Sequence, residues 1–600
     1  MRSSYESSNW RFYFAPTPEM GITGRVISSG LEWLSMADNK LFYGDNLDVL
    51  RRYVRDESVD LIYLDPPFNS RQDYNVLFAE KDGTRSSSQI TAFEDTWEWN
   101  LDAERAYQEV VERGGWVSKA MQAFRNFLGN SDMMAYLAMM APRLLELKRV
   151  LKVTGSIYLH CDPTASHYLK MLMDAVFRPQ NFRSEITWKR TSSHSAAKRW
   201  GDIHDTILFY SNGPSYVWND VIVPHSTDYS ARYKNLDSNG EMWADDNLTG
   251  PGVRHGDSGA VWRGYDVTAK GLHWKVSSKA VVAIVGEEAA KALSTTQRLD
   301  LLDANGYIHW PRQRSGQGPG FPRFKRYLSA GGRIQDVVTD IPPINSQAQE
   351  RLGYPTQKPE ALLERIIKAS SNQGDIVLDP FCGCGTAVVA AQRLQRRWIG
   401  IDITPLATTL IKTRLADIFG PEIRKSYEVI GEPTSVPDAR ELAKTEPTHF
   451  QYWALGLVDA RPVEERKGAD RGIDGRLYFH VDNSGKTMQI IFSVKAGQNI
   501  NVAFVRDLRG VIEREKAAIG VLITMEEPTR PMLKEAAEAG FYKDESAFDT
   551  GTYPRIQILT VEQLLSGAQV QYPRLLDATF KKAPKARGAA VEQLKLDPAE

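Results

Sequence analysis

One run of thirty residues, GDIVLDPFCGCGTAVVAAQRLQRRWIGIDI (374–403), constrains the fold more than any other part of the chain. An apolar strand ends at Asp379, and Gly383 and Gly385 then let the backbone turn tightly. Thr386 opens a helix, and the next strand ends at Asp402, where a carboxylate can accept hydrogen bonds from both hydroxyls of a ribose. The run therefore predicts a strand–helix–strand unit that binds a nucleoside. The alternative, a turn whose glycines serve only packing, is disfavoured by the terminal acid.

Helices and strands alternate elsewhere in the chain as well. Residues 58–70 contain a short apolar strand, and residues 132–151 carry apolar side chains at helical spacing. A strand at 155–162, a helix at 166–177 and a strand at 184–190 follow. This alternation predicts an α/β fold around a mostly parallel sheet.

Length and composition limit the number of domains, the kind of nucleic-acid surface and the cellular location that the chain can have. Six hundred residues predict about two to four domains. The net charge of -1 means that any nucleic-acid surface must be a local patch. Three cysteines cannot build a disulfide framework, and we expect a cytoplasmic protein with no membrane span. Cys382 and Cys384 form a C-x-C without a second Cys/His pair, so small loop residues are favoured over a metal site.

The corner Asp65-Pro66-Pro67-Phe68 follows a buried strand. Two prolines fix the backbone and remove two N–H donors, so the Asp65 carboxylate and the Pro66 carbonyl form a rigid pair of acceptors. An exocyclic amine, such as adenine N6 or cytosine N4, offers the two matching N–H groups, and Phe68 can stack on the base. A strand-end turn with an N-capping Asp is the plainer alternative.

Three motifs in order carry a resemblance to a known family. DPPF comes first, then TQKP within GYPTQKPEALLERII (353–367), then FCGCGT. This order resembles the permuted β-group of DNA amino-methyltransferases over residues 39–415, and further stretches are similar to type III modification subunits. The resemblance implies a permuted Rossmann-like sheet, S-adenosylmethionine as cofactor and methyl transfer to adenine N6 of a flipped base in double-stranded DNA. Cytosine N4 is the alternative target.

The resemblance also assigns residues. It implies that Asp65, Pro66, Pro67 and Phe68 form the catalytic corner, with Phe68 replacing the commoner Tyr. The implied cofactor-binding residues are Asp45, Thr356, Lys358, Pro359, Asp379, Phe381, Gly383, Gly385, Thr386 and Asp402.

An inserted region between the two halves is rich in Gly, Ser, aromatic and charged residues. Residues 306–333 contain no acid, and basic and aromatic side chains alternate there, which suits phosphate contacts and stacking. The predicted DNA-binding residues are Arg312, Arg314, Arg323, Lys325 and Arg326, and residues 187–200 form a second candidate. A solvated basic face over an aromatic core is the alternative.

The C-terminal region is again α/β and resembles PD-(D/E)xK nucleases of the Mrr type. Asp474 and Lys495 match the pattern, whereas Ser493 stands where the family has Glu or Gln. With Asp474 as the one expected carboxylate ligand, Mg²⁺ should bind weakly unless Asp470 or Glu465 contributes. A retained fold without cleavage is favoured, and a bifunctional restriction-modification enzyme with Mg²⁺-dependent cleavage is the competing hypothesis.

The expected organisation follows from these assignments. Double-stranded DNA is the expected partner, a restriction or translocase subunit is a further candidate, and the oligomeric state stays open, with a homodimer as one option. The predicted regions are an N-terminal extension (1–38), a catalytic half (39–190), a target-recognition insert (191–350), a cofactor-binding half (351–430), a linker (431–448), a nuclease-like domain (449–570) and a tail (571–600).

Overall fold

The computed structural model describes most of the chain, as two compact units. One unit comprises residues 220–335, called here the insert unit, and the other comprises the described residues on either side of it, called the main unit. None of the described helices is long and apolar enough to cross a membrane. The described residues are 39–67, 73–76, 90–94, 98–191, 198, 200–311, 321–345, 348, 350–352, 354, 356–463, 472–480, 487–543, 551–573 and 576–577.

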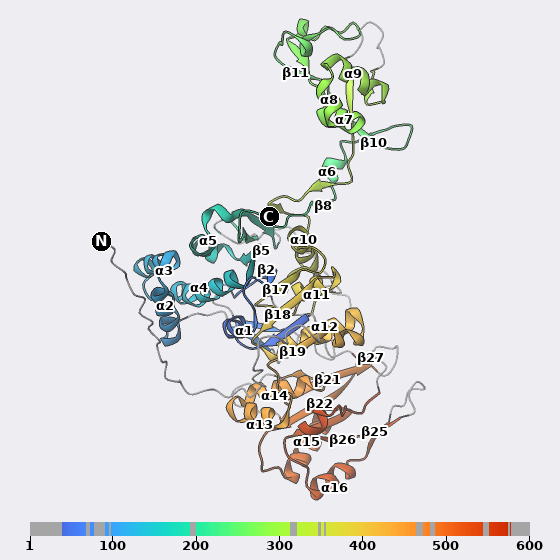
Figure 1. Ribbon diagram of the computed structural model, residues 1–600. Coiled ribbons are helices and arrows are strands. Elements are labelled where there is room, and N and C mark those ends of the chain that lie inside the picture. The colour runs from blue at the N-terminus through green and yellow to red at the C-terminus, as the bar shows by residue number, and fades with distance from the viewer. Residues whose placement is uncertain are drawn as a thin grey trace, which may run out of the picture. The chain divides into compact units, whose positions relative to one another are not determined.

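A nine-stranded sheet forms the centre of the main unit (Figure 1). Within it, β7 alone runs antiparallel to its neighbours. The predicted α/β fold with a mostly parallel sheet is therefore confirmed. The strands, in spatial order, are β16 (Val337–Val338), β6 (Phe182–Lys189), β7 (His204–Ser211), β5 (Leu151–Cys161), β2 (Val59–Leu64), β17 (Ile376–Asp379), β18 (Arg397–Asp402), β1 (Asn39–Tyr43) and β19 (Tyr427–Ile430).

Helices cover both faces of this sheet. One layer contains α1 (Asn46–Tyr53), α4 (Asp132–Val150) and α5 (Pro163–Phe177), with α2 (Leu101–Arg113) and α3 (Gly115–Leu128) packed beside them. The other contains α10 (Glu360–Ser370), α11 (Thr386–Arg393) and α12 (Pro405–Phe419).

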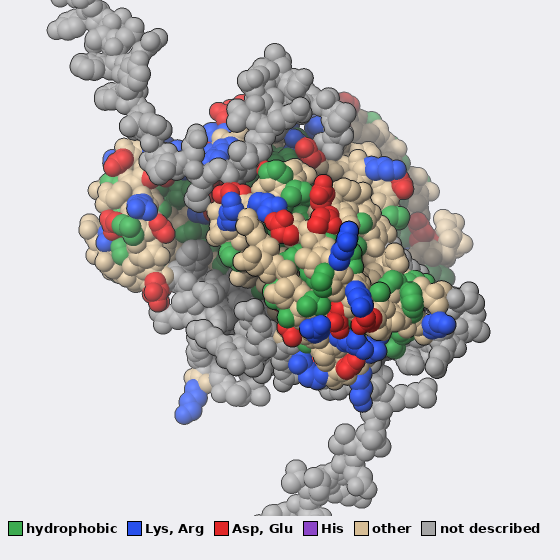
Figure 2. Space-filling model, turned by 90° about the horizontal axis from the view of Figure 1, so that it is seen from below, with side chains coloured by type: hydrophobic (Ala, Val, Ile, Leu, Met, Phe, Trp, Pro, Cys, Tyr) green, Lys and Arg blue, Asp and Glu red, His purple; other side chains and the backbone are tan. Residues whose placement is uncertain are grey.

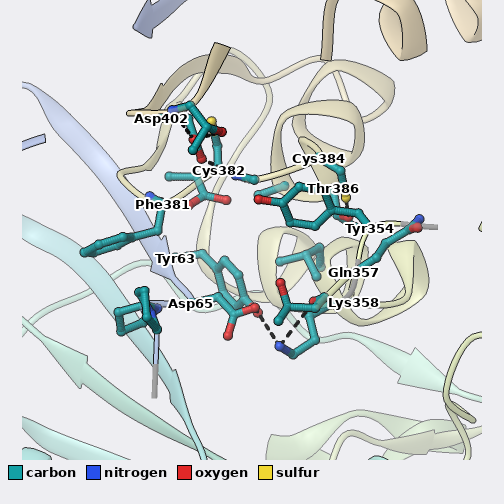
Figure 3. A pocket seen from close by; sticks show the side chains of 18 of the residues that line it. Tyr63, Asp65, Tyr354, Gln357, Lys358, Phe381, Cys382, Cys384, Thr386 and Asp402 are labelled. Carbon is teal, nitrogen blue, oxygen red and sulfur yellow. Dashed lines mark hydrogen bonds and ion pairs between the residues drawn. The ribbon is translucent and has the colours of Figure 1, made fainter. Parts of the chain in front are cut away.

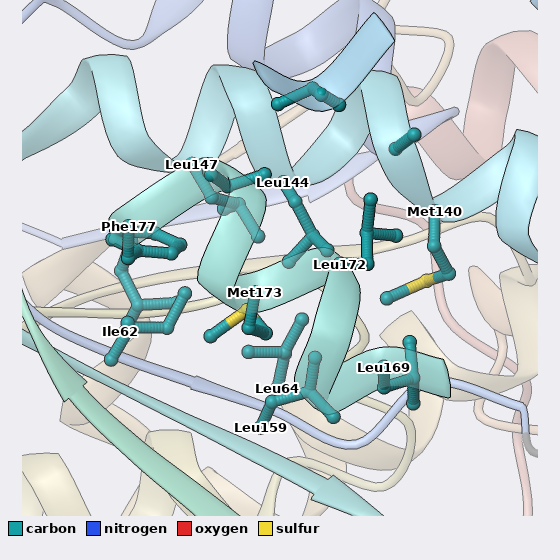
Figure 4. Packing of buried hydrophobic residues seen from close by; sticks show 14 of the residues in the cluster. Ile62, Leu64, Met140, Leu144, Leu147, Leu159, Leu169, Leu172, Met173 and Phe177 are labelled. Atoms are coloured by element: carbon teal, nitrogen blue, oxygen red, sulfur yellow. The ribbon is translucent and has the colours of Figure 1, made fainter. Parts of the chain in front are cut away.

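Alternate side chains of strand β2 point to opposite faces of the sheet and so join different helix layers. Ile62 and Leu64 join the α4–α5 core (Figure 4), whereas Leu61 and Tyr63 join the core on the opposite face. Because β2 is buried on both faces, it is an unbroken apolar run.

The sheet order brings distant sequence together. Strand β2 pairs with β17, and β17 pairs with β18, all in parallel. Since parallel strands end at the same edge, Asp65, Asp379 and Asp402 lie along one edge despite their separation in sequence.

The insert unit has its own core. A four-stranded sheet contains β13 (Ile308–His309), β14 (Arg323–Tyr327), β10 (Met242–Asn247) and β9 (Asn235–Leu236). Its buried core includes Trp262, Trp274 and Leu302. This unit is narrower than the predicted insert of 191–350, because β7 (residues 204–211) belongs to the nine-stranded sheet.

The C-terminal region is built on a second sheet, with hydrophobic cores on its two faces. The strands are β20 (Arg461–Pro462), β21 (Gly475–His480), β22 (Thr487–Lys495), β23 (Ile519–Thr524) and β26 (Ile556–Thr560), with β27 (Leu576–Asp577) beside β21. The helices are α13 (Val436–Thr445), α14 (Pro447–Gly456), α15 (Val502–Glu515), α16 (Arg530–Glu538) and α17 (Val561–Leu565).

Two features of this region bear on the sequence analysis. Helix α13 lies in the segment predicted as a linker (431–448). Its Ala439 is fully buried in the same core as Phe450, so this part of the segment packs against the C-terminal region. Charged side chains of both signs are intermixed on the face seen in Figure 2. Ion pairs such as Arg506–Glu535 join α15 to α16, and each pair balances a positive charge with a negative one at the surface of these helices.

Candidate functional site

A cavity lies at the edge where β2, β17 and β18 end (Figure 3). Its empty volume, including the part open to solvent, is about 820 Å³. The lining residues come from the Asp-Pro-Pro corner, the TQKP segment, the glycine loop and the end of β18: Tyr63, Asp65, Pro66, Pro67, Tyr354, Thr356, Gln357, Lys358, Leu363, Asp379, Phe381, Cys382, Gly383, Cys384, Thr386, Ala387, Asp402, Ile403 and Thr404.

Asp65 occupies the end of β2 and is held by Lys358. The Lys358 ammonium donates to Asp65 Oδ2 at 2.6 Å, and the two side chains are only 9% and 13% exposed. The second oxygen, Oδ1, is buried and has no hydrogen-bond partner among the described residues. A buried carboxylate oxygen without a donor is costly in a folded protein, so this atom is set up to receive an N–H group from a ligand.

The glycine loop wraps around the carboxylate of Asp402. The Gly383 N–H donates to Asp402 Oδ2 at 2.8 Å, and Thr404 donates twice to Oδ1, from its N–H at 2.9 Å and its hydroxyl at 2.8 Å. Gly385 has φ +76°, and a Cβ there would lie 2.7 Å from Ile411 Cγ1. Only glycine meets both demands, so this position fixes the loop's course.

Arg414 supports the loop from behind. Its guanidinium donates to the Cys384 carbonyl at 3.1 Å and lies 3.2 Å from the Thr386 hydroxyl oxygen, where α11 begins. The side chain is buried in α12, thirty residues beyond the loop. The sequence offered no signal for this contact, because it depends on how α12 packs.

Burial dominates the electrostatics of the cavity. It raises the pKa of Asp379 well above its ordinary value, and the nearby Asp65 and Asp402 carboxylates raise it further against a hydrogen bond from the Phe381 N–H. Burial also raises the pKa of Asp402, against hydrogen bonds from Thr404 and Gly383.

Burial raises the thiol pKa values of Cys382 and Cys384 as well, so both favour the protonated form. No cluster of three or more metal-ligating side chains occurs in the described part of the chain.

Some of the other predicted cofactor residues line the cavity and some do not. Thr356 and Lys358 line the cavity, whereas Pro359 caps α10 and is not among the lining residues. Asp45 caps α1 and pairs with Arg143 at 2.6 Å, outside the cavity lining. Phe68 lies outside the described residues. The sequence analysis did not single out the lining residues Tyr63, Tyr354 and Gln357, although Tyr354 and Gln357 lie within the GYPTQKP segment.

The predicted DNA-binding residues lie in the insert unit or outside the described residues. Arg323 pairs with Asp245 at 2.9 Å, and Arg326 pairs with Asp246. Lys325 lies over the Trp243 ring, 5.5 Å from its centroid. Arg312 and Arg314 are outside the described residues. Ion pairs between β10 and β14 thus bring an acid to each of two predicted DNA contacts, Arg323 and Arg326.

The nuclease-like residues lie together at the end of β22. Asp474 Oδ2 accepts the Val494 N–H at 2.5 Å, and Lys495 Nζ lies 4.0 Å from the same oxygen. Ser493 is buried in the strand where a second carboxylate is expected. Glu465 and Asp470 fall outside the described residues.

Comparison with known proteins covers both regions. The sequence matches the family described as "DNA methylase" over residues 59–413, and the "NACHT-associated inactive Restriction Endonuclease 1" family over residues 451–566. These matches confirm the two predicted resemblances, with the second refined from the Mrr type to a family described as inactive.

Two relatives of known class agree with the first match. Type II methyltransferase M.EcaI of Enterobacter cloacae is 30% identical over 383 residues, covering 63% of this chain and 69% of that protein. The StyLTI Mod subunit of a type III restriction-modification enzyme of Salmonella typhimurium is 26% identical over 387 residues, covering 62% of this chain and 53% of that protein. The solved M1.HpyAVI-SAM complex is 14% identical with a TM-score of 0.28, covering 63% of this chain and 98% of that one.

Proposed function

Because this chain belongs to the DNA methylase family, we propose that it transfers a methyl group from S-adenosylmethionine to adenine N6 in double-stranded DNA. One observation carries the proposal. A single cavity joins the unpartnered Oδ1 of Asp65 to the glycine loop and Asp402. An acceptor for an exocyclic amine and a nucleoside-binding acid therefore share one space.

The residues at the loop end of the cavity fit the cofactor. Asp402 Oδ2 takes one protein donor and keeps a lone pair for a ribose hydroxyl, whereas Oδ1 already accepts two hydrogen bonds from Thr404. Gly383 lines the cavity, and a Cβ there would lie 3.2 Å from the Tyr354 ring, so a side chain at this position would crowd the lining. When bound, S-adenosylmethionine would supply an electrophilic methyl group on a sulfonium.

At the other end, the Asp65 corner orients the nucleophile. A base inside a duplex cannot reach Asp65, so the target must rotate out of the stack at a cost of a few kcal/mol. In this proposal Asp65 Oδ1 accepts one amine N–H and the carbonyl of Pro66, which also lines the cavity, accepts the other. These bonds draw the nitrogen lone pair out of conjugation with the ring and toward in-line attack.

Lys358 determines which carboxylate oxygen does this work. Its ammonium occupies Oδ2, which leaves Oδ1 for the amine and balances the buried negative charge. The nitrogen–methyl bond forms as the carbon–sulfur bond breaks, and the amine loses one proton, for which Asp65 Oδ1 is the nearest proposed acceptor.

The choice of adenine rests on the Asp-Pro-Pro-Phe corner. By family resemblance, cytosine N4 enzymes more often carry Ser at the position of Asp65. The partners follow as parts of the same proposal: the similarity to a type III Mod subunit supports a separate restriction subunit. A homodimer and a cytoplasmic location stay expectations.

Nucleoside analysis of methylated DNA tests the proposal. Unmodified plasmid incubated with protein and methyl-labelled cofactor should yield N6-methyladenine, and sequencing of the modified positions then gives the target site. Asp65→Ala should lower the rate by about 10²-fold or more. Asp102→Ala, on the exposed surface of α2, is the matched control. Full activity in Asp65→Ala would refute the assigned role, and N4-methylcytosine as product would refute adenine.

A further inference from the structure

Three buried side chains form a hydrogen-bonded chain that starts at the cavity. Tyr63 lines the cavity together with Asp65 (Figure 3), and its hydroxyl lies 2.9 Å from His160 Nδ1. His160 Nε2 lies 3.1 Å from Asp205 Oδ2. The residues come from the adjacent strands β2, β5 and β7, and His160 is fully buried. None of the motifs read from the sequence includes His160 or Asp205.

The carboxylate of Asp205, at the end of the hydrogen-bonded chain away from the cavity, determines which atoms of the chain carry protons. Burial by itself would raise the pKa of Asp205, but its interactions with His160 and with the cations Lys358 and Arg190 lower the pKa overall. An ionised carboxylate can only accept hydrogen bonds. His160 must therefore carry a proton on Nε2.

Charge balance favours a neutral imidazole. Arg190 Nη1 lies 3.1 Å from Asp205 Oδ1, so the guanidinium already compensates this carboxylate. A cationic His160 would place a second positive charge beside one negative charge in a fully buried position, which is costly. A neutral ring with Nε2–H leaves Nδ1 as an acceptor, and the Tyr63 hydroxyl must donate to it.

The hydroxyl of Tyr63 keeps its proton. Burial, followed by the nearby charges of Asp65, Asp379 and Asp205, raises the pKa of Tyr63 well above its ordinary value. With that single hydrogen directed to His160, the oxygen can offer a ligand only its lone pairs.

We propose that Asp205 and His160 are positioning residues that hold Tyr63 as an acceptor-only group, so that the cavity admits an exocyclic amine and rejects an exocyclic carbonyl. The inference rests on the proposed function and names what selects its substrate. An amine whose two hydrogens go to Asp65 Oδ1 and the Pro66 carbonyl leaves neither acceptor unpaired, whereas a carbonyl oxygen would supply no hydrogen to Oδ1 and would face the lone pairs of Oδ1 and of Tyr63. Sites built to pair with a donor discriminate strongly against a ligand that lacks it.

The test compares two bases at the mapped target position. Duplexes carry either adenine or hypoxanthine, which has a carbonyl in place of the amine, and both are measured as competitors of methylation. The ratio of the two inhibition constants reports the preference for the amine. Because the cost of rotating each base out of the duplex is the same for every variant, it cancels when ratios are compared between proteins.

Asp205→Asn should change that ratio most. Arg190 favours the amide oxygen at the Oδ1 position, so the amide NH₂ faces His160 Nε2 and the imidazole proton moves to Nδ1. Tyr63 then accepts from His160 and turns its own hydrogen toward the cavity. We expect the preference for adenine to fall by about tenfold in Asp205→Asn, and severalfold in Tyr63→Phe, which lacks the oxygen.

Tyr158→Phe is the matched control. It removes a hydroxyl that is equally buried in the neighbouring strand but bonds Ser370 at 2.6 Å, and Tyr158 is not among the cavity-lining residues. Its ratio should equal that of the wild type. An unchanged ratio in Tyr63→Phe overturns the inference, even if Asp205→Asn fails to fold. A wild-type protein that does not methylate DNA at all overturns the proposed function instead.

Discussion

At the scale of single residues, the pairing of Lys358 with Asp65 couples stability to catalysis. Both side chains are almost fully buried, so each charge has lost most of its hydration and depends on the other. The sequence contained both residues in recognisable motifs, but not the fact that one binds the other.

Removing the ammonium should therefore affect both properties. Lys358→Met leaves Asp65 buried and uncompensated, which should lower the free energy of unfolding by about 3 kcal/mol and the methylation rate by about tenfold or more. Urea denaturation and initial rates measure the two effects. Lys368→Met, which breaks an exposed pair with Glu364, should cost less than about 1 kcal/mol. Equal losses in the two variants would contradict this account.

Titration of Asp379 should make the free energy of unfolding depend on pH. Its pKa is raised in the folded protein above the ordinary value near 3.9, so folding takes up a proton. That contribution is fully present below the unfolded pKa and is lost as the pH rises through the folded pKa. Asn cannot lose a proton but can still accept from the Phe381 N–H.

Asp379→Asn should therefore gain stability relative to wild type as the pH rises. Urea midpoints of the two proteins without cofactor, measured at pH 5 and pH 8, give the comparison. We expect the difference in favour of the variant to be larger at pH 8. A difference that does not change with pH would mean that Asp379 titrates as it does in the unfolded chain.

Local sequence motifs identified several of the residues that line the cavity, and their roles stay predictions. Asp65, Gly383 and Asp402 line one cavity, as their positions after strands suggested, whereas Gly385 is not among the lining residues. Tyr63, His160, Asp205 and Arg414 were not found, because their contacts join strands and helices far apart in sequence. Such contacts depend on strand order and register, which no local pattern specifies.

At the scale of secondary-structure elements, the loop between β17 and α11 is the most constrained. Gly385 combines a left-handed backbone with direct contact against Ile411 of α12. The apolar runs that predicted β2, α4, β17 and β18 were sufficient because each is buried against the cores. Strand β7 was missed because it lies within a polar, loop-rich stretch, although its own run TILFY is apolar.

Gly385→Ala tests the close packing of this loop. The left-handed conformation costs about 1 to 2 kcal/mol with a Cβ, and displacement of Ile411 adds to this. We expect larger losses in stability and in cofactor affinity, measured by calorimetry, than in Gly374→Ala. Gly374 also has positive φ, at +83°, but a Cβ there meets nothing within 4 Å. Similar behaviour of the two variants would exclude a special role for the contact with Ile411.

At the scale of the whole molecule, the methyltransferase sheet is joined to a restriction-endonuclease-like region of a family described as inactive. The composition of its site explains why cleavage should be lost. Mg²⁺ in nucleases needs carboxylate oxygens, yet Asp474 is the sole carboxylate of the predicted pattern among the described residues. One of its oxygens already accepts the Val494 N–H and lies near Lys495, and Ser493 supplies no charge.

We therefore expect the protein to leave unmethylated supercoiled plasmid intact when Mg²⁺ is present at about 10 mM. The protein concentration is the one that methylates the same plasmid completely. Methylation in a parallel reaction shows that the preparation is active and binds the DNA. Agarose electrophoresis separates supercoiled, nicked and linear forms. Linear product that disappears both with EDTA and in Asp474→Asn would contradict the prediction, since it would require this site to hold Mg²⁺ with ligands beyond the pattern. Cleavage that persists in Asp474→Asn would come from a different source and leave this site without nuclease activity.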